Sequence, residues 1–169
     1  MAGGDFRLVA EEGKPFLVMT RSFAAPRGLV FEALSKPEFV RRWLLGPPGW
    51  TMPVCDIDFR VGGRYRYVWR HQPDGAEMGM GGVYREIVVP SRIVATEKFD
   101  QAWYPGEAFG AYDLVEKAGR TTVALTVTYG SVEARDVVLR SPMEQGVAMG
   151  FDRLEEVVAS MGGPGGGRP

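Results

Sequence analysis

The sequence predicts an α+β domain in which a curved antiparallel sheet wraps around one long C-terminal helix. Three observations carry this prediction. A strand-like segment near the start is followed by two short helical segments, the middle of the chain has a hydrophobic period of two, and the last segment has a helical period. The length of 169 residues indicates one domain.

The first expected strand covers residues 16–23, and two short helices follow it. Pro26 opens the first helix, because proline lacks the amide hydrogen that a first-turn residue leaves unpaired. Pro37 opens the second helix, which ends before the glycine- and proline-rich loop at 46–49.

The middle of the chain alternates between apolar and polar residues. Tyr65, Tyr67 and Trp69 alternate with arginines, so one face of this strand is aromatic and the other is mostly cationic. Asp56 and Asp58 lie on the polar face of the preceding strand, which we expect to face solvent, and the arginines of the next strand are candidate partners across the sheet. Further strands are expected at 80–89, 92–99, 109–116 and 121–129. The sheet therefore has about seven strands.

The segment 142–161 predicts one amphipathic helix of about five turns. Its apolar residues recur at three- and four-residue steps: Met143, Val147, Phe151, Leu154, Val158 and Met161. Gly146 and Gly150 share one face of this helix, where each glycine costs about 1 kcal/mol of helix stability relative to alanine. We expect them to permit close packing, and room for a ligand is the alternative.

The two ends of the chain are expected to lie outside the packed domain, which covers 16–161. Residues 1–15 mix small and charged types and predict a flexible segment. Residues 162–169 are almost entirely glycine and proline and predict a disordered tail.

Composition excludes several classes of function. A net charge of −1 argues against nucleic-acid binding. No apolar run reaches the roughly 20 residues of a membrane span, and the N-terminus lacks a secretory signal. Cys55 is the only cysteine, which excludes an intramolecular disulfide and favours the cytoplasm. The chain also has only one histidine, so we expect no metal site and no cofactor.

Several short motifs stand in one order along 16–161. They are Phe23-x-Ala25-Pro26, Val30-Phe31-x-Ala33-Leu34, Trp43, Gly46-Pro47, Asp58-x-Arg60-x-Gly62-Gly63-x-Tyr65, Gly82-x-Tyr84-x-Glu86-Ile87, Pro90-x-Arg92-Ile93, Thr121-Thr122 before Leu125-Thr126, and Gly150-Phe151 before Leu154. Their order and spacing resemble the activator of heat-shock-protein-90 ATPase homologue-like branch of the SRPBCC (START-related) superfamily. The resemblance implies a helix-grip (START-like) fold, with a cavity between the sheet and the C-terminal helix.

Members of that superfamily bind hydrophobic small molecules in the cavity, and a minority catalyse cyclisation or hydrolysis there. The resemblance therefore implies a carrier or sensor of a lipid, aromatic or polyketide-like ligand. A chaperone partner is not expected, because only about 15 residues precede the first expected strand, whereas the full co-chaperone has a separate N-terminal domain. A homodimer through exposed edge strands stays open.

Large aromatic residues are the candidate cavity wall, because ligand pockets are mostly apolar with a few polar tips. The candidates are Tyr65, Tyr67, Trp69, Tyr84, Trp43, Trp50, Trp103, Val147 and Phe151. The hydroxyls of Tyr65 and Tyr67 are candidate polar anchors. Packing against the terminal helix is the alternative for the rings, and Trp43 is expected to anchor the helix-to-strand connection rather than to form a gate.

An enzyme is the less favoured alternative, and no catalytic residue is assigned. His71 adjoins a turn and is expected at the surface, so it offers no catalytic triad. Glu86 and Glu97 lie in expected strands, and either one would provide acid–base chemistry only if it pointed inward.

Overall fold

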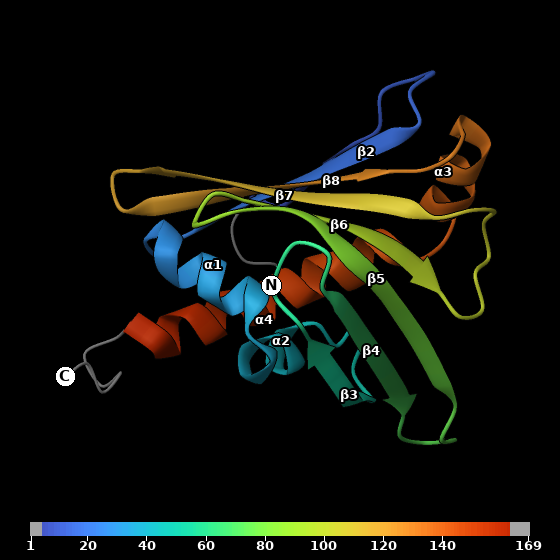
Figure 1. Ribbon diagram of the computed structural model, residues 1–169, viewed down its shortest axis with the longest axis horizontal. Coiled ribbons are helices and arrows are strands. Elements are labelled where there is room, and N and C mark those ends of the chain that lie inside the picture. The colour runs from blue at the N-terminus through green and yellow to red at the C-terminus, as the bar shows by residue number, and fades with distance from the viewer. Residues whose placement is uncertain (1–4, 163–169) are drawn as a thin grey trace.

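The computed structural model describes residues 5–162, which form one eight-stranded antiparallel sheet and four helices (Figure 1). The elements are β1 (Arg7–Val9), β2 (Phe16–Phe23), α1 (Arg27–Ser35), α2 (Pro37–Trp43), β3 (Trp50–Ile57), β4 (Arg64–His71), β5 (Glu77–Val88), β6 (Arg92–Phe99), β7 (Ala108–Lys117), β8 (Arg120–Thr128), α3 (Val132–Leu139) and α4 (Met143–Gly162). The α+β helix-grip architecture predicted from the sequence is confirmed.

The sheet is a meander with one added pair of strands. Strands β3 to β8 pair consecutively, and β2 pairs with β8, so the order is β1-β2-β8-β7-β6-β5-β4-β3. In Figure 1 the sheet curves around α4, drawn in orange to red, and α1, drawn in blue, and α2, drawn in blue-green, lie beside it. Both short helices contact α4. The concave face of the sheet therefore looks toward the helix that ends the chain.

Two short elements were not expected from the sequence. Arg7–Val9 form β1 within the segment expected to be flexible, because their backbone pairs with Val18–Thr20 at the otherwise open edge of β2. This strand raises the number from about seven to eight. The helix α3 begins directly after Ser131, whose hydroxyl accepts a hydrogen bond from the amide of Ala134 at 3.0 Å. Of the tail predicted at 162–169, only Gly162 lies within the described residues, where it ends α4.

Phe151 of α4 is the centre of the packing between the helices and the sheet. Its side chain is fully buried, and its ring lies 5.9 Å from that of Phe23 in β2 and 6.1 Å from that of Phe6. The ring of Trp43 in α2 lies 6.1 Å away on another side. Trp43 also donates its indole hydrogen to the carbonyl of Ala33 at 2.9 Å, so it ties α2 to α1 as expected for an anchor.

The two glycines of α4 have different surroundings. A Cβ at Gly150 would lie 3.4 Å from the carbonyl oxygen of Trp43, so Gly150 lets α2 approach the helix closely. A Cβ at Gly146 would meet no atom within 4 Å. Close packing therefore explains Gly150, whereas Gly146 faces open space.

Gly146→Ala is expected to raise the free energy of unfolding by up to about 1 kcal/mol, because alanine improves helix propensity and nothing opposes the added methyl group. Urea denaturation measures the change. Gly28→Ala is the matched control, since Gly28 lies in α1 with equally open space around its Cβ position. A loss of stability for Gly146→Ala alone would contradict this description of α4.

The convex face of the sheet carries ion pairs, and Arg66 and Arg70 take partners other than the candidate aspartates Asp56 and Asp58. Arg66 lies opposite Asp56 in the register of β3 and β4. Its guanidinium nevertheless pairs with Asp100, with N–O distances of 2.8 and 2.6 Å. Arg70 pairs with Glu77 at 2.7 Å. Glu77 belongs to β5 and Asp100 directly follows β6, so both pairs extend across the sheet away from β3.

Within residues 5–162, no helix combines the length and the apolar composition that a membrane crossing requires.

Candidate functional site

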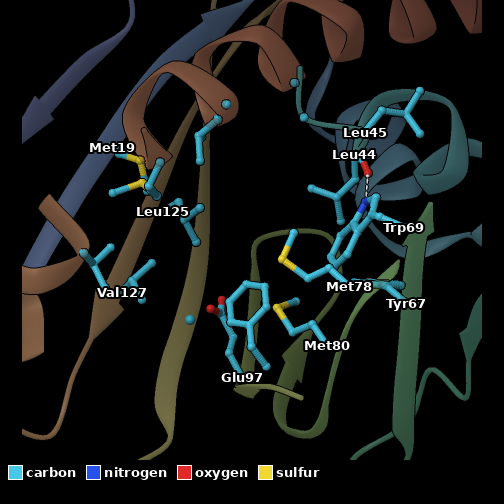
Figure 2. A pocket seen from close by; sticks show the side chains of 18 of the residues that line it. Met19, Leu44, Leu45, Tyr67, Trp69, Met78, Met80, Glu97, Leu125 and Val127 are labelled. Carbon is cyan, nitrogen blue, oxygen red and sulfur yellow. Dashed lines mark hydrogen bonds between the residues drawn. The ribbon is translucent and has the colours of Figure 1, made fainter. Parts of the chain in front are cut away.

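A cavity of about 610 Å³ lies between the concave face of the sheet and α4. Side chains from β2, from β4 to β8 and from α4 line it, together with the loop after α2. Figure 2 shows the interior, with Met78, Met80 and Trp69 on one side and Leu125 and Val127 on the other. The volume falls in the range of about 300–1,000 Å³ that is typical of small-molecule sites.

Strand β4 contributes an aromatic ladder to this wall. Tyr65, Tyr67 and Trp69 are separated by two residues each, so their side chains share one face of the strand. The rings of Tyr65 and Tyr67 lie 4.9 Å apart, and those of Tyr67 and Trp69 lie 5.9 Å apart. All three side chains are buried. The ladder is therefore both part of the core and part of the cavity wall.

The structure brings together all of the residues nominated from the sequence. The cavity is lined by Tyr65, Tyr67, Trp69, Tyr84, Trp43, Trp50, Trp103, Val147 and Phe151. Trp103 is 41% exposed and its ring lies 4.8 Å from that of Phe99, which places it at the rim. The ring of Trp50 lies 4.9 Å from that of His71. Contact with a ligand stays a prediction for every one of them.

The hydroxyl of Tyr65, one of the two polar anchors that the sequence suggested, already has a partner within the wall. Tyr65 donates its hydroxyl to the backbone carbonyl of Thr96 at 2.6 Å. The neighbouring Tyr67 lowers the pKa of Tyr84, against the larger effect of burial, which raises it. Trp69 likewise donates its indole hydrogen to the carbonyl of Leu44 at 2.7 Å, the dashed line in Figure 2. The hydrogen atoms of Tyr65 and Trp69 thus hold the wall together and are not free to be donated to a ligand.

Glu97 of β6 is the polar group that does point into the cavity (Figure 2). It follows Ile93 and Ala95 on the inward face of its strand, and its side chain passes over Gly110 of β7. A Cβ at Gly110 would come 2.5 Å from Oε2 of Glu97, so the glycine makes room for the carboxylate. Burial raises the pKa of Glu97 to about 7.

The other carboxylate considered from the sequence points outward. Glu86 is exposed and accepts a hydrogen bond from Arg92 at 3.1 Å. Glu86 points outward although it is two residues from the inward-facing Tyr84, because a β-bulge between them on β5 interrupts the alternation of side chains. The two glutamates thus share a residue type but differ entirely in environment.

The free energy of unfolding of Glu97→Gln is expected to increase relative to that of the wild type as the pH rises. The pKa of this carboxyl is about 7 in the folded protein, whereas the unfolded chain ionises near about 4.3. Between these values the folded protein holds more protons, so the free energy of unfolding of the wild type falls with rising pH. Glutamine does not ionise and avoids that loss.

Urea denaturation from about pH 5 to about pH 8 should show the variant gaining about 2 kcal/mol on the wild type. The exposed Glu107 provides the control Glu107→Gln, for which the difference should stay constant. A constant difference for Glu97→Gln as well would contradict an ionisable carboxyl held in an apolar cavity.

Several lining residues were not singled out in the sequence. Met80, Tyr112 and Tyr129 continue the inward alternation of β5, β7 and β8, so the period of two contained the signal. Tyr104 lies in the loop between β6 and β7, where no periodicity exists to place it. Its hydroxyl is buried without a hydrogen-bond partner among residues 5–162.

The remaining reactive residues lie away from this wall. Cys55 is buried, and burial raises the pKa of its thiol to about 11, so it behaves as a small apolar residue. His71 lies 2.8 Å from Asp74 through Nδ1 and does not line the cavity. No group of three His, Cys, Asp or Glu side chains suited to a metal ion occurs within the described range 5–162.

Comparison with protein families adds a match over most of the chain. The model of a family described as activator of Hsp90 ATPase homolog 1-like protein matches residues 24–159. A comparison with the curated proteins gives no match.

Solved structures from several bacteria resemble this chain along nearly their whole length. A protein of Rhodobacter sphaeroides is 29% identical with a TM-score of 0.83, and the match covers 90% of this chain and 98% of that one. A protein of Mycobacterium smegmatis is 24% identical with a TM-score of 0.79, covering 89% and 94%. A Silicibacter pomeroyi protein that carries the family's name is 22% identical with a TM-score of 0.69, covering 85% and 97%.

Proposed function

The chain belongs to the activator of Hsp90 ATPase homolog 1-like family, and on that premise we propose that it binds a hydrophobic small molecule as a carrier or sensor. One observation carries the proposal: a cavity of about 610 Å³ whose wall is almost entirely aromatic and aliphatic. A protein core normally packs without voids larger than a water molecule. An apolar space of this size is thus suited to an apolar occupant, and the cytoplasm is the proposed setting, where a lone cysteine such as Cys55 stays reduced.

The energetics favour a ligand that fills most of the cavity. Burying about 250 Å² of apolar surface gains roughly 6 kcal/mol at about 25 cal/mol per Å². Association costs of about 4 kcal/mol or more offset much of this gain. A useful affinity therefore needs a larger apolar body or one well-placed polar contact.

The proposal is tested with the neutral fluorescent probe N-phenyl-naphthylamine, whose emission rises in apolar surroundings. We expect saturable binding by the wild type and at least about tenfold weaker binding by Gly146→Phe. Gly146 lines the cavity with open space at its Cβ position, so a phenyl group there occupies the volume that the probe needs.

Gly28→Phe, on the exposed surface of α1 and away from the cavity, is the matched control and should bind like the wild type. Circular dichroism verifies that both variants fold. Equal binding by folded Gly146→Phe and wild type, or no binding by any of the three proteins, would sink the proposal. A chaperone-binding role would use the outer surface and would be unaffected by Gly146→Phe, so the same variant separates the two functions.

A second candidate, a proton-transferring enzyme, is favoured by the presence of Glu97 in the cavity. A carboxyl with a pKa of about 7 is suited to general acid–base catalysis near neutral pH. This candidate predicts that a ligand recovered from the wild type after incubation is chemically altered and that Glu97→Gln leaves it unchanged. Recovery of unaltered ligand from both proteins argues for binding alone.

A further inference from the structure

The charge distribution of the cavity wall is the starting point. Among the residues of the range 5–162 that line the cavity, Glu97 alone has a side chain that carries a charge at neutral pH. It makes no hydrogen bond and no ion pair with any residue in that range. An ionised carboxylate without a partner in an apolar site destabilises the folded protein, because its charge loses hydration and no protein group replaces the lost interactions.

The other titratable groups in the wall are tyrosines. They come from β4, β5, the loop after β6, β7 and the residue that follows β8: Tyr65, Tyr67, Tyr84, Tyr104, Tyr112 and Tyr129. Burial, and then the charge of Glu97, raise the pKa of Tyr104 to about 12. The same two causes, in the same order, raise the pKa of Tyr112 and of Tyr129. These hydroxyls therefore stay neutral near physiological pH, and α4 adds no charged side chain to the wall.

The aromatic residues give the carboxylate surroundings of a particular kind. The rings of Tyr104 and Tyr129 meet edge to face at 5.2 Å, and the ring of Trp103 lies 5.3 Å from that of Tyr104. The faces of such rings carry negative electrostatic potential, which attracts cations and repels anions. A positive charge in this cavity would thus meet aromatic rings as well as the carboxylate of Glu97, whereas a second negative charge would be repelled by the carboxylate.

We propose that the ligand of this cavity is an apolar molecule bearing one protonated amine, which pairs with Glu97 while its apolar body lies along β4, β5 and α4. The proposal rests on the ligand-binding function above and specifies the chemical class of the ligand. An ammonium group provides the hydrogen-bond donors that the carboxylate lacks, and the ion pair is formed away from water. A fatty acid or another anion would place a second negative charge in the same cavity.

Displacement of N-phenyl-naphthylamine by octylamine and by octanol tests this, since the two ligands share their chain length and differ in the head group. At about pH 8, where Glu97 is ionised, the wild type should bind octylamine at least about tenfold more tightly than octanol. In Glu97→Gln the preference should vanish or reverse, while octanol affinity changes by less than about threefold. Octanol binding also shows that the variant is folded, and the exposed-site control Glu107→Gln should keep the preference.

The pH profile of the wild type is a second readout. Because Glu97 must ionise to pair, octylamine affinity should fall about tenfold per pH unit below about pH 7, whereas octanol affinity stays flat. The amine itself remains protonated throughout, with a pKa of about 10. Binding of octanol and probe without any amine preference would overturn this inference and leave the ligand-binding function standing. Failure of all three ligands to bind would overturn both.

Discussion

Gly82→Ala is expected to lower the free energy of unfolding by about 3 kcal/mol. Gly82 lies in β5 opposite Tyr65 of β4, at a point where three strands crowd together. A Cβ there would lie 2.7 Å from Cε2 of Tyr65 and would overlap the backbone carbonyl of Thr96 in β6. That carbonyl accepts the hydroxyl of Tyr65, so it cannot move without breaking the bond that fixes the ring in the cavity wall.

Urea denaturation measures the loss, and Gly130→Ala is the control because a Cβ at Gly130 meets nothing within 4 Å. We expect Gly130→Ala to change the free energy of unfolding by less than about 1 kcal/mol. Equal stability of the two variants would show that β4, β5 and β6 do not pack as described. Gly82→Ala should also weaken probe binding, since displacement of Tyr65 alters the wall.

Phe151→Ala is expected to lower the free energy of unfolding by about 4 kcal/mol. The phenyl ring is fully buried at the junction of α4 with Phe23 of β2, Trp43 of α2 and Phe6. Its removal forfeits these contacts and leaves a void that the rigid surroundings fill only in part.

Val147 provides the comparison one helical turn away, because it is half-buried at the cavity wall and the cavity beside it is already open. Val147→Ala should cost about 1 kcal/mol, since it removes two partly buried methyl groups. Thermal unfolding followed by circular dichroism distinguishes the two values. If Phe151→Ala lowered the free energy of unfolding by less than about 2 kcal/mol, Phe151 would not be the main contact that holds α4 against the sheet.

The spacing of hydrophobic residues along the sequence predicted those strands and helices that bury one whole side. The alternation of Tyr65, Tyr67 and Trp69 placed one face of β4 inward, and the three- and four-residue steps of α4 placed Phe151 toward the sheet. The same rule applied to β6 places Glu97 on the face of Ile93. The inward carboxylate was thus present in the pattern, although a charged residue on an apolar face is ordinarily the exception.

Other features depend on partners that are distant in the sequence and leave no local pattern. The strand β1 has three residues and forms because the edge of β2 is free to pair with it. The hydroxyl of Tyr65 bonds to Thr96, which is 31 residues away, so no local pattern could show that this hydroxyl already has a partner. Tyr104 reaches the cavity from an irregular loop. Tertiary packing alone determines such positions.

Methionine methyl NMR during a titration with octylamine tests most directly that the cavity is the ligand site. Met19, Met78, Met80 and Met143 line the cavity, whereas Met52 and Met161 do not. We predict saturable shifts of the four lining methyl signals at one common dissociation constant, with Met52 and Met161 unchanged. Shifts at Met52 or Met161 without shifts at the lining methionines, or no saturable shift at all, would contradict a ligand site between the sheet and α4.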